Sequence, residues 1–399
     1  MITAAAGLFR VLGGLLTDKS GLESRIYSII LGLALLLMLV DVIRGRGLRH
    51  LLKIELILFA LWLGWAFFSS VFVATIEGDV AGVYRNATLA GLTMLVTSTF
   101  TARAGSFSYV ATGALFAGVA LFVASVISGE AFLIFSLQGQ RLGNDVGNAN
   151  EWGYVYLLAF IGAVTLLNGD FLSRVRKLGL WMASVPLVLG IILTGSRKAF
   201  VASIFLTIVS FVLSLSTRRI SWRRLVLGVC ILTVLYFVIS LVYESTFLGE
   251  RLQETTTLTS LAEREQERLG YYEQLPDVLE KHPLSGVGLG RWTQISYTGK
   301  APHSEYVAVF GETGLIGGIL YFGLYVILIV RLKKGMAWHG KAGEAIVPKI
   351  LLTVVITLLL VAAGRWNYSN PFHYALLGGI IGYAWRYRLT RAFITKRSC

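Results

Sequence analysis

Long apolar runs alternate with short polar connections along almost the whole chain. A helix needs about 20 mostly apolar residues to cross the ~30 Å hydrocarbon core of a bilayer, and most of the runs are close to that length. The connections between the runs carry most of the charged residues. The pattern predicts eleven membrane-spanning helices: 25–43, 54–74, 87–102, 107–127, 152–168, 179–194, 199–215, 225–243, 314–330, 346–363 and 372–385.

The composition agrees with this interpretation, because 55% of the 399 residues are apolar and mean hydropathy is +0.70. These values lie outside the range of soluble globular domains. A net charge of +14 would suggest nucleic-acid binding in a soluble protein. Here Lys and Arg gather in alternate connections, as they do on the cytoplasmic side of membrane proteins, so no nucleic-acid partner is expected. The basic connections are 44–53, 173–178, 216–224, 331–341 and 386–397.

A twelfth candidate span, residues 2–16, is short and contains Arg10, and it can equally be an interfacial helix. The N-terminus has no cleavable signal pattern, so we expect about twelve spans with both ends in the cytoplasm. The sequence thus predicts an all-α polytopic membrane protein, with residues 1–399 in a single integral membrane domain. Cys230 lies within a span and Cys399 in the tail, so no disulfide framework is expected.

One long connection, residues 244–303, is expected to form a helical insert on the outer, periplasmic side. Its stretch "TSLAEREQERLGYYEQLPDVLEKHP" at 259–283 has helical spacing. Gly286, Gly288 and Gly290 follow and resemble a nucleotide-binding loop. No strand precedes them in a βαβ unit, so they favour a tight backbone turn instead.

His303 stands where the insert ends. It follows Pro302, a helix-start residue, and opens the segment that leads through Glu312-Thr313-Gly314 to the next span. A histidine there titrates near neutral pH and can take a proton from a hydroxyl, or it can simply satisfy helix-end groups. Paired with Glu305 it resembles a metal site, but residues two apart do not share a helix face, so no metal is expected.

The turn "LTGSRKAF" at 193–200 breaks the charge rule, by which Lys and Arg gather on the cytoplasmic side, because Arg197 and Lys198 are expected on the outer side. Ser196 is a plausible N-cap for the following helix. A helix N-terminus with two added cations makes an anion site at the membrane interface. Snorkelling of both side chains to lipid headgroups is the alternative. Arg197 is the better phosphate ligand, because its planar donors bind two oxygens at once.

Two further groups of residues are candidates for ligand binding. Arg264 and Arg268 lie one turn apart on the predicted insert helix and can close over an anion, although Glu265 can instead pair with Arg268. Asn150, in "LGNDVGNANEW" at 142–152, is a candidate ligand of sugar hydroxyls. The Asn, Asp and Gly cluster around it is typical first of turns and caps.

These segments resemble the O-antigen ligase and polymerase superfamily, bacterial membrane proteins that share the Wzy-type domain. "NDVGNANEW" is similar to its Asn-rich entry to a middle span, and "LTGSRKAF" to its Ser-Arg turn. "LEKHPLSGVGLGRW" and "APHSEYVAVFGETGLIGG" are similar to its His-Pro, Gly-rich and Pro-His-Asn segment. The resemblance covers about residues 144–330. One departure is Ser304, where relatives often have Asn.

The resemblance implies a GT-C-like glycosyltransferase of the bacterial inner membrane, with its active site facing the periplasm. Its donor would be a glycan on undecaprenyl pyrophosphate and its acceptor a sugar hydroxyl of lipid A-core, in lipopolysaccharide biosynthesis. The reaction would invert the configuration of the anomeric carbon and would need no metal or cofactor. His303 would be the base, and Arg197 and Arg268 would neutralise the leaving group. The expected substrate-binding residues are Lys198, Arg264, Ser196, Asn150 and Glu305.

Two alternatives stay open. A polymerase that joins lipid-linked repeats needs the same base and anion clamp, and we favour a ligase because relatives of this length carry one dominant insert before the histidine. A lipid or solute transporter is the alternative of another class, although transporters place ionisable residues at mid-bilayer. Membrane lipids are expected partners, and the sequence leaves the sugars and the oligomeric state open.

Overall fold

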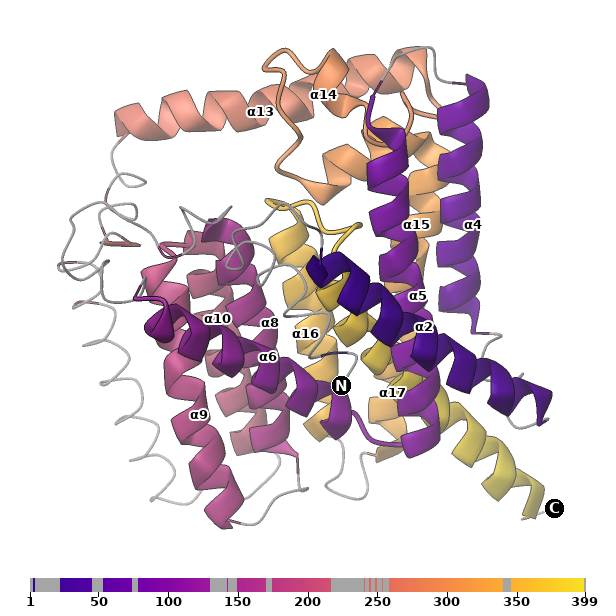
Figure 1. Ribbon diagram of the computed structural model, residues 1–399, viewed down its shortest axis with the longest axis vertical. Helices are drawn as coiled ribbons and strands as arrows, with labels where there is room; N and C mark the ends of the chain where they lie inside the picture. The colour runs from indigo at the N-terminus through magenta and orange to yellow at the C-terminus, as the bar shows by residue number, and fades with distance from the viewer. Residues whose placement is uncertain are drawn as a thin grey trace. The chain divides into compact units, whose positions relative to one another are not determined.

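The structure, a computed structural model, describes residues 22–44, 53–73, 78–129, 149–169, 174–216, 258–339 and 346–397, with a few isolated residues between them. Every regular element in these ranges is a helix, which confirms the all-α prediction (Figure 1). In chain order the elements are α2 (Leu22–Ile43), α4 (Ile54–Phe68), η1 (Ser69–Val73), α5 (Val80–Ala104), α6 (Ser108–Ile127), α8 (Ala149–Asn168), α9 (Arg174–Leu193), α10 (Arg197–Ser216), α13 (Leu258–Lys281), α14 (Trp292–Ile295), α15 (Glu305–His339), α16 (Ile346–Ala362) and α17 (Pro371–Arg397).

Several helices have the dimensions of membrane spans. Every predicted span except 225–243 coincides with a helix of the structure, and 225–243 and the candidate 2–16 lie outside the described residues. The total of twelve spans therefore stays a prediction. In the described ranges, five helices are long and apolar enough to cross a membrane: Ile54–Phe72, Ser108–Ile127, Ala149–Asn168, Arg176–Leu193 and Glu305–Met336.

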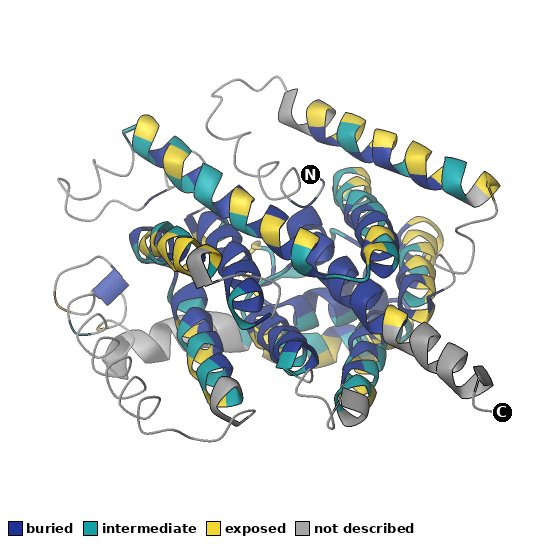
Figure 2. Cartoon of the chain, turned by 90° about the horizontal axis from the view of Figure 1, so that it is seen from below, coloured by how far each residue is buried: buried dark blue, intermediate teal, exposed yellow. Residues whose placement is uncertain are grey.

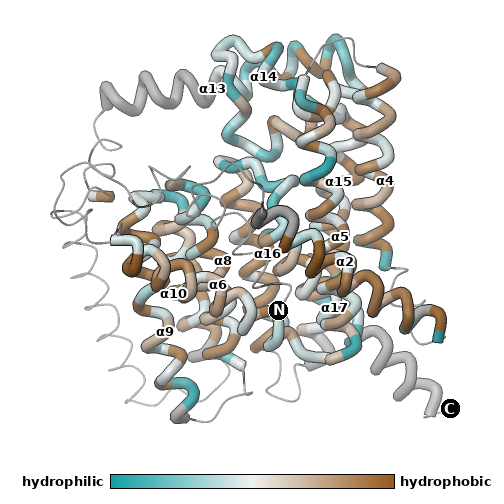
Figure 3. Tube along the Cα trace, in the orientation of Figure 1, coloured by the Kyte–Doolittle hydropathy of each residue, from teal (hydrophilic) through white to brown (hydrophobic). Residues whose placement is uncertain are grey.

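Exposed apolar side chains on several helices agree with a lipid environment. Leu36, Phe72, Ile127 and Ile319 are large and exposed, and Figure 2 shows exposed positions alternating with buried ones along individual helices. Figure 3 shows mostly hydrophobic colour along α2 and α4 and hydrophilic colour around α14. A water-soluble surface would not tolerate so much exposed apolar area, so these faces suit contact with lipid.

The chain divides into two compact units. The first comprises Met1–Ile30, Ser108–Leu261 and Gly335–Thr357, and the second comprises Leu31–Phe107, Ala262–Lys334 and Leu358–Cys399. In the first unit, α8 is almost wholly buried and packs against α6, α9 and α10. Gly162 on α8 lies against the backbone oxygen of Ala111, a close approach that small residues permit in membrane helices.

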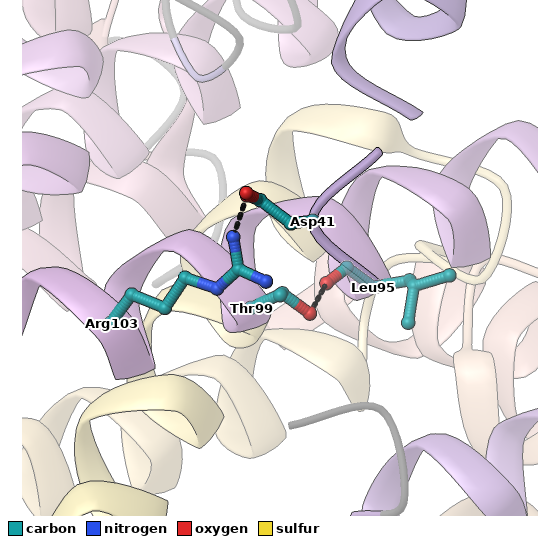
Figure 4. Close-up of polar contacts among 4 residues, drawn as sticks. All are labelled: Asp41, Leu95, Thr99 and Arg103. Carbon is teal, nitrogen blue, oxygen red and sulfur yellow. Dashed lines mark hydrogen bonds and ion pairs between the residues drawn. The ribbon is translucent and has the colours of Figure 1, made fainter. Parts of the chain in front are cut away.

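In the second unit, α5 and α17 pack closely along one another. Gly378 and Gly382 of α17, spaced four apart, lie against the backbone of α5 at Met94 and Ser98, so larger residues would force the helices apart. Near the end of α5, Arg103 forms an ion pair with Asp41 of α2 (Figure 4). A second ion pair, Arg331 to Glu55 at 2.9 Å, joins α15 to α4.

Helix α15 is interrupted at Gly314, as predicted from Glu312-Thr313-Gly314, and then continues to His339. Gly314 has φ 66° and ψ −169°, a conformation open to glycine and strained for other residues. The interruption removes helical hydrogen bonds from the backbone groups beside it. Four hydrogen bonds from other segments take their place: Val287 N to Gly311 O (2.9 Å), Gly288 N to Glu312 O (2.9 Å), Trp65 Nε1 to Thr313 O (2.9 Å) and Leu315 N to Pro283 O (2.9 Å).

The predicted insert helix is present as α13, and the glycine-rich segment after it forms the expected tight turn. Gly286, Gly288 and Gly290 have φ of 64°, 96° and 74°. A small apolar core then joins α13 and the glycine-rich segment to the start of α15. It consists of Tyr271, Val278, Val287, Trp292 and Val307.

The glycine-rich turn predicts a difference between two alanine substitutions with the same backbone cost. Gly286 and Gly299 both have φ 64°, where a Cβ costs about 1–2 kcal/mol. At Gly286 the new Cβ would also lie 2.5 Å from Gly311 O, whereas at Gly299 it meets nothing within 4 Å. We expect Gly286→Ala to lower the thermal midpoint of the detergent-solubilised protein much further than Gly299→Ala. Equal midpoints would contradict the packing described here.

Candidate functional site

His303 is exposed directly before the start of α15, whose first residue is Glu305. The preceding Pro302 and the following Ser304 are both buried, so the histidine projects from a fixed stretch of backbone. Its ring lies edge-to-face with Tyr271 of α13, with 6.5 Å between ring centroids. An exposed imidazole is reachable by a large substrate, and the tyrosine restricts its orientation.

Ser304 holds the first turn of α15. Its hydroxyl oxygen accepts a hydrogen bond from the Val307 backbone N at 3.4 Å, which is the bond an N-cap residue makes. The same oxygen lies 2.8 Å from the hydroxyl of Tyr272 in α13. Asn and Ser are both good N-caps. The departure from the family's Pro-His-Asn pattern at Ser304 therefore preserves the start of the helix.

Glu305 is buried and hydrogen-bonded on both carboxylate oxygens. Tyr321 donates to Oε1, and Asn367 donates to Oε2 at 3.2 Å. The Tyr321 hydroxyl also lies 2.6 Å from that of Tyr374, and Arg365 Nε donates to Asn367 Oδ1 at 2.8 Å. These contacts connect the residue two positions after His303 to the 363–370 connection between α16 and α17.

The sequence reasoning missed the 363–370 connection as part of this region. A sign was available, because Arg365 lies in a connection expected on the outer side and so breaks the charge rule in the same way as Arg197. The pairing of Asn367 with Glu305 could not be foreseen, since 62 residues separate them and no local pattern links them.

Glu312, one residue before Thr313 at the break in α15, is the second buried carboxylate of this region. Its Oε2 accepts from Tyr368 at 2.7 Å, and its Oε1 lies 3.4 Å from the backbone N of Trp292. Burial raises the pKa of Tyr368 well above its usual value, so the phenol stays protonated and can donate. Glu312 thus fixes the glycine-rich segment to the 363–370 connection.

The predicted anion-binding turn lies in the first unit. Helix α10 begins at Arg197, and the preceding Ser196 is buried, with its carbonyl accepting from Phe200 N at 3.0 Å. Arg197 and Lys198 are half-buried. Gly153 of α8 packs directly on Ser196. A Cβ atom added at position 153 would lie only 2.5 Å from the Cβ of Ser196.

The structure says less about the remaining candidate ligand-binding residues. Asn150 is exposed on the first turn of α8, one turn before the Gly153 contact with Ser196. Arg264 and Arg268 lie on α13, as predicted, but their side chains are outside the described part of the structure. His303 and Glu305 belong to the second unit and Arg197 to the first, so their action on one substrate stays a prediction.

No group of three His, Cys, Asp or Glu side chains that could hold a metal ion occurs within the described ranges. The carboxylates nearest to His303 in sequence, Glu305 and Glu312, are instead engaged by tyrosine, asparagine and backbone donors. The exposed imidazole of His303 is therefore a ligand candidate of this region.

Comparison with known proteins found a family that is similar to part of the chain. No curated protein matches the chain. Residues 182–322 match the family model described as O-antigen ligase. The matched segment includes Arg197, Arg268 and His303 and ends before the 363–370 connection. The match agrees with the resemblance derived from the sequence: residues 182–322 are similar to the O-antigen ligase family, whose members are membrane glycosyltransferase-like enzymes acting on lipid-linked sugars.

Proposed function

We propose that the protein is an O-antigen ligase, which moves a glycan from undecaprenyl pyrophosphate to a sugar hydroxyl of lipid A-core on the periplasmic face of the inner membrane. The observation that carries the proposal is the exposed His303 at a capped helix start, inside the segment that matches the family. A base for two lipid-borne substrates has to be accessible and fixed, and His303 combines both properties.

The proposed reaction is a direct displacement. His303 takes the proton of the acceptor hydroxyl, and the hydroxyl oxygen attacks the anomeric carbon as the bond to the pyrophosphate breaks. Attack from the opposite face inverts the anomeric centre. Undecaprenyl pyrophosphate leaves with its charge neutralised by Arg197 and Arg268, so no metal is required.

The other candidates have supporting parts in this proposal. Lys198 and Arg264 add positive charge beside the pyrophosphate, Ser196 holds the start of α10, and Asn150 binds a sugar hydroxyl. Because the Glu305 carboxylate is buried and engaged by Tyr321 and Asn367, we assign it to shaping the site below His303.

The base assignment predicts the effect of removing one imidazole. His303→Ala should lower glycan transfer by about 10² to 10⁴, the usual contribution of general base catalysis. His282→Ala is the matched control, because the described bonds of His282 use its backbone, which alanine keeps. Transfer from a labelled lipid-linked glycan at matched membrane levels is the measurement. Near wild-type transfer by a well-expressed His303→Ala variant would show that His303 is not the base.

The assignment of Arg197 as a ligand of the pyrophosphate predicts that arginine and lysine at this position differ in transfer activity. Lysine keeps the charge of Arg197 but loses the fork that binds two phosphate oxygens, so Arg197→Lys should be seriously impaired and Arg197→Ala nearly inactive. Lys198, about 100° further around α10, should tolerate alanine better. A snorkelling role instead predicts an active Arg197→Lys.

The same assay with magnesium or with a chelator examines the metal-independent mechanism. We expect wild-type transfer to be unchanged by the chelator, because arginine supplies the positive charge at the leaving group. Loss of wild-type activity in chelator would instead assign that charge to a metal.

The choice of acceptor separates the ligase from the polymerase. Purified protein supplied with a lipid-linked glycan should extend lipid A-core and leave a second lipid-linked repeat unchanged. Extension of the repeat alone would make the protein a polymerase. The same reaction in detergent excludes a transporter, because only an enzyme releases undecaprenyl pyrophosphate without a sealed compartment.

A further inference from the structure

Tyr272 is an exposed ring whose hydroxyl is fully engaged. This residue of α13 is 41% exposed, yet its hydroxyl oxygen lies 2.8 Å from Ser304 Oγ and 2.9 Å from Ala363 O. These partners are 32 and 91 residues away in sequence. One hydroxyl thus joins the insert helix, the residue after His303 and the connection between α16 and α17.

The direction of the two hydrogen bonds follows from proton counting. A tyrosine hydroxyl has one proton, and a backbone carbonyl can only accept. The proton of Tyr272 therefore goes to Ala363 O, and Ser304 must donate its own proton to Tyr272. The Ser304 oxygen remains an acceptor for Val307 N. The result is an ordered chain, the hydroxyl bridge, from Val307 N through Ser304 and Tyr272 to Ala363 O.

The hydroxyl bridge lies beside two features of the candidate site. Tyr271, the neighbour of Tyr272, contacts the His303 ring, so the docking of α13 also orients the imidazole. Arg268 lies four residues before Tyr272, one turn away on the same side of α13. A shift of this helix would therefore move the α13 arginine and alter the ring contact that orients His303.

We infer that Tyr272 and Ser304 are positioning residues of the transfer reaction, whose hydroxyl bridge sets the place of α13 over His303. The inference rests on the proposed function. A displacement of about 1 Å at a catalytic group can cost about 100-fold in rate. Tyr272→Phe removes only the hydroxyl and keeps the ring.

The first test compares two Tyr→Phe variants. Tyr272→Phe should lower the maximal transfer rate about 10- to 100-fold, with little change in the KM for the lipid-linked donor and a thermal midpoint close to wild type. Tyr297→Phe is the matched control, because that hydroxyl also bonds α13, at Asp277, and this bond involves neither Ser304 nor Ala363. Equal rates for the two variants would overturn the inference.

The second test separates positioning from helix capping at Ser304. Ser, Asn and Asp are all good N-caps, so a role confined to capping predicts similar activity for all three. The bridge requires a donor to Tyr272. Asn supplies one through Nδ2 while Oδ1 accepts from Val307 N, and an ionised Asp does not. We expect Ser304→Asn to keep most activity and Ser304→Asp to lose it. Equal activity would reduce Ser304 to a cap.

A third readout does not depend on the reaction. Without the bridge, the backbone amides of residues 303–310 should exchange hydrogen faster in Tyr272→Phe than in wild type or Tyr297→Phe. Unchanged exchange would overturn the bridge even in an active enzyme. If wild type transfers to neither acceptor, the proposed function fails, while faster exchange in Tyr272→Phe would still support the bridge. The two failures are therefore distinguishable.

Discussion

The arrangement around His303 depends on the interruption of α15 at Gly314. A broken helix in an apolar environment exposes backbone groups that water cannot satisfy, and each unsatisfied group costs several kcal/mol. Here the glycine-rich segment supplies the partners for Gly311 and Glu312, and Trp65 supplies the partner for Thr313. Because that segment follows directly after α13, satisfying the break also anchors the C-terminal end of the insert helix.

The two buried carboxylates extend this principle from the backbone to side chains. Glu312 lies at the break and binds Tyr368 and the Trp292 backbone, while Glu305 lies at the helix start and binds Tyr321 and Asn367. A buried carboxylate is costly unless several donors reach it. Each one therefore holds the 363–370 connection against α15, Glu305 through Asn367 and Glu312 through Tyr368.

The sequence predicted the elements well and their long-range contacts poorly. Apolar runs located the helices because burial in lipid requires length and hydrophobicity, which are local properties. The predicted span 87–102 began too late, because α5 already starts at Val80. The Asp79 side chain caps this start by accepting a hydrogen bond from Gly82 N at 3.0 Å, and the helix then runs through the polar Arg85. Such a cap can be identified from sequence once the apolar criterion is relaxed.

The site was predicted in part for the same reason. His303, the glycine turn and the start of α10 carry local patterns of proline, glycine and charge. The partners of Glu305 and Ser304 do not, because Asn367 and Tyr272 reach them through tertiary packing. The total number of spans, the side on which the insert lies and the joint action of Arg197 with His303 stay predictions.

A base that serves two lipid-anchored substrates cannot be held by burial. Enzymes commonly fix a catalytic side chain by packing around it, but the proposed function requires His303 to stay open to a long glycan and to its acceptor. The protein instead fixes the residues on either side. Pro302 and Ser304 are buried, Glu305 is bound by two donors, and only the imidazole between them is exposed. The rigidity of the site thus comes from backbone and neighbours, which is why a single tyrosine hydroxyl can matter to a histidine that it does not touch.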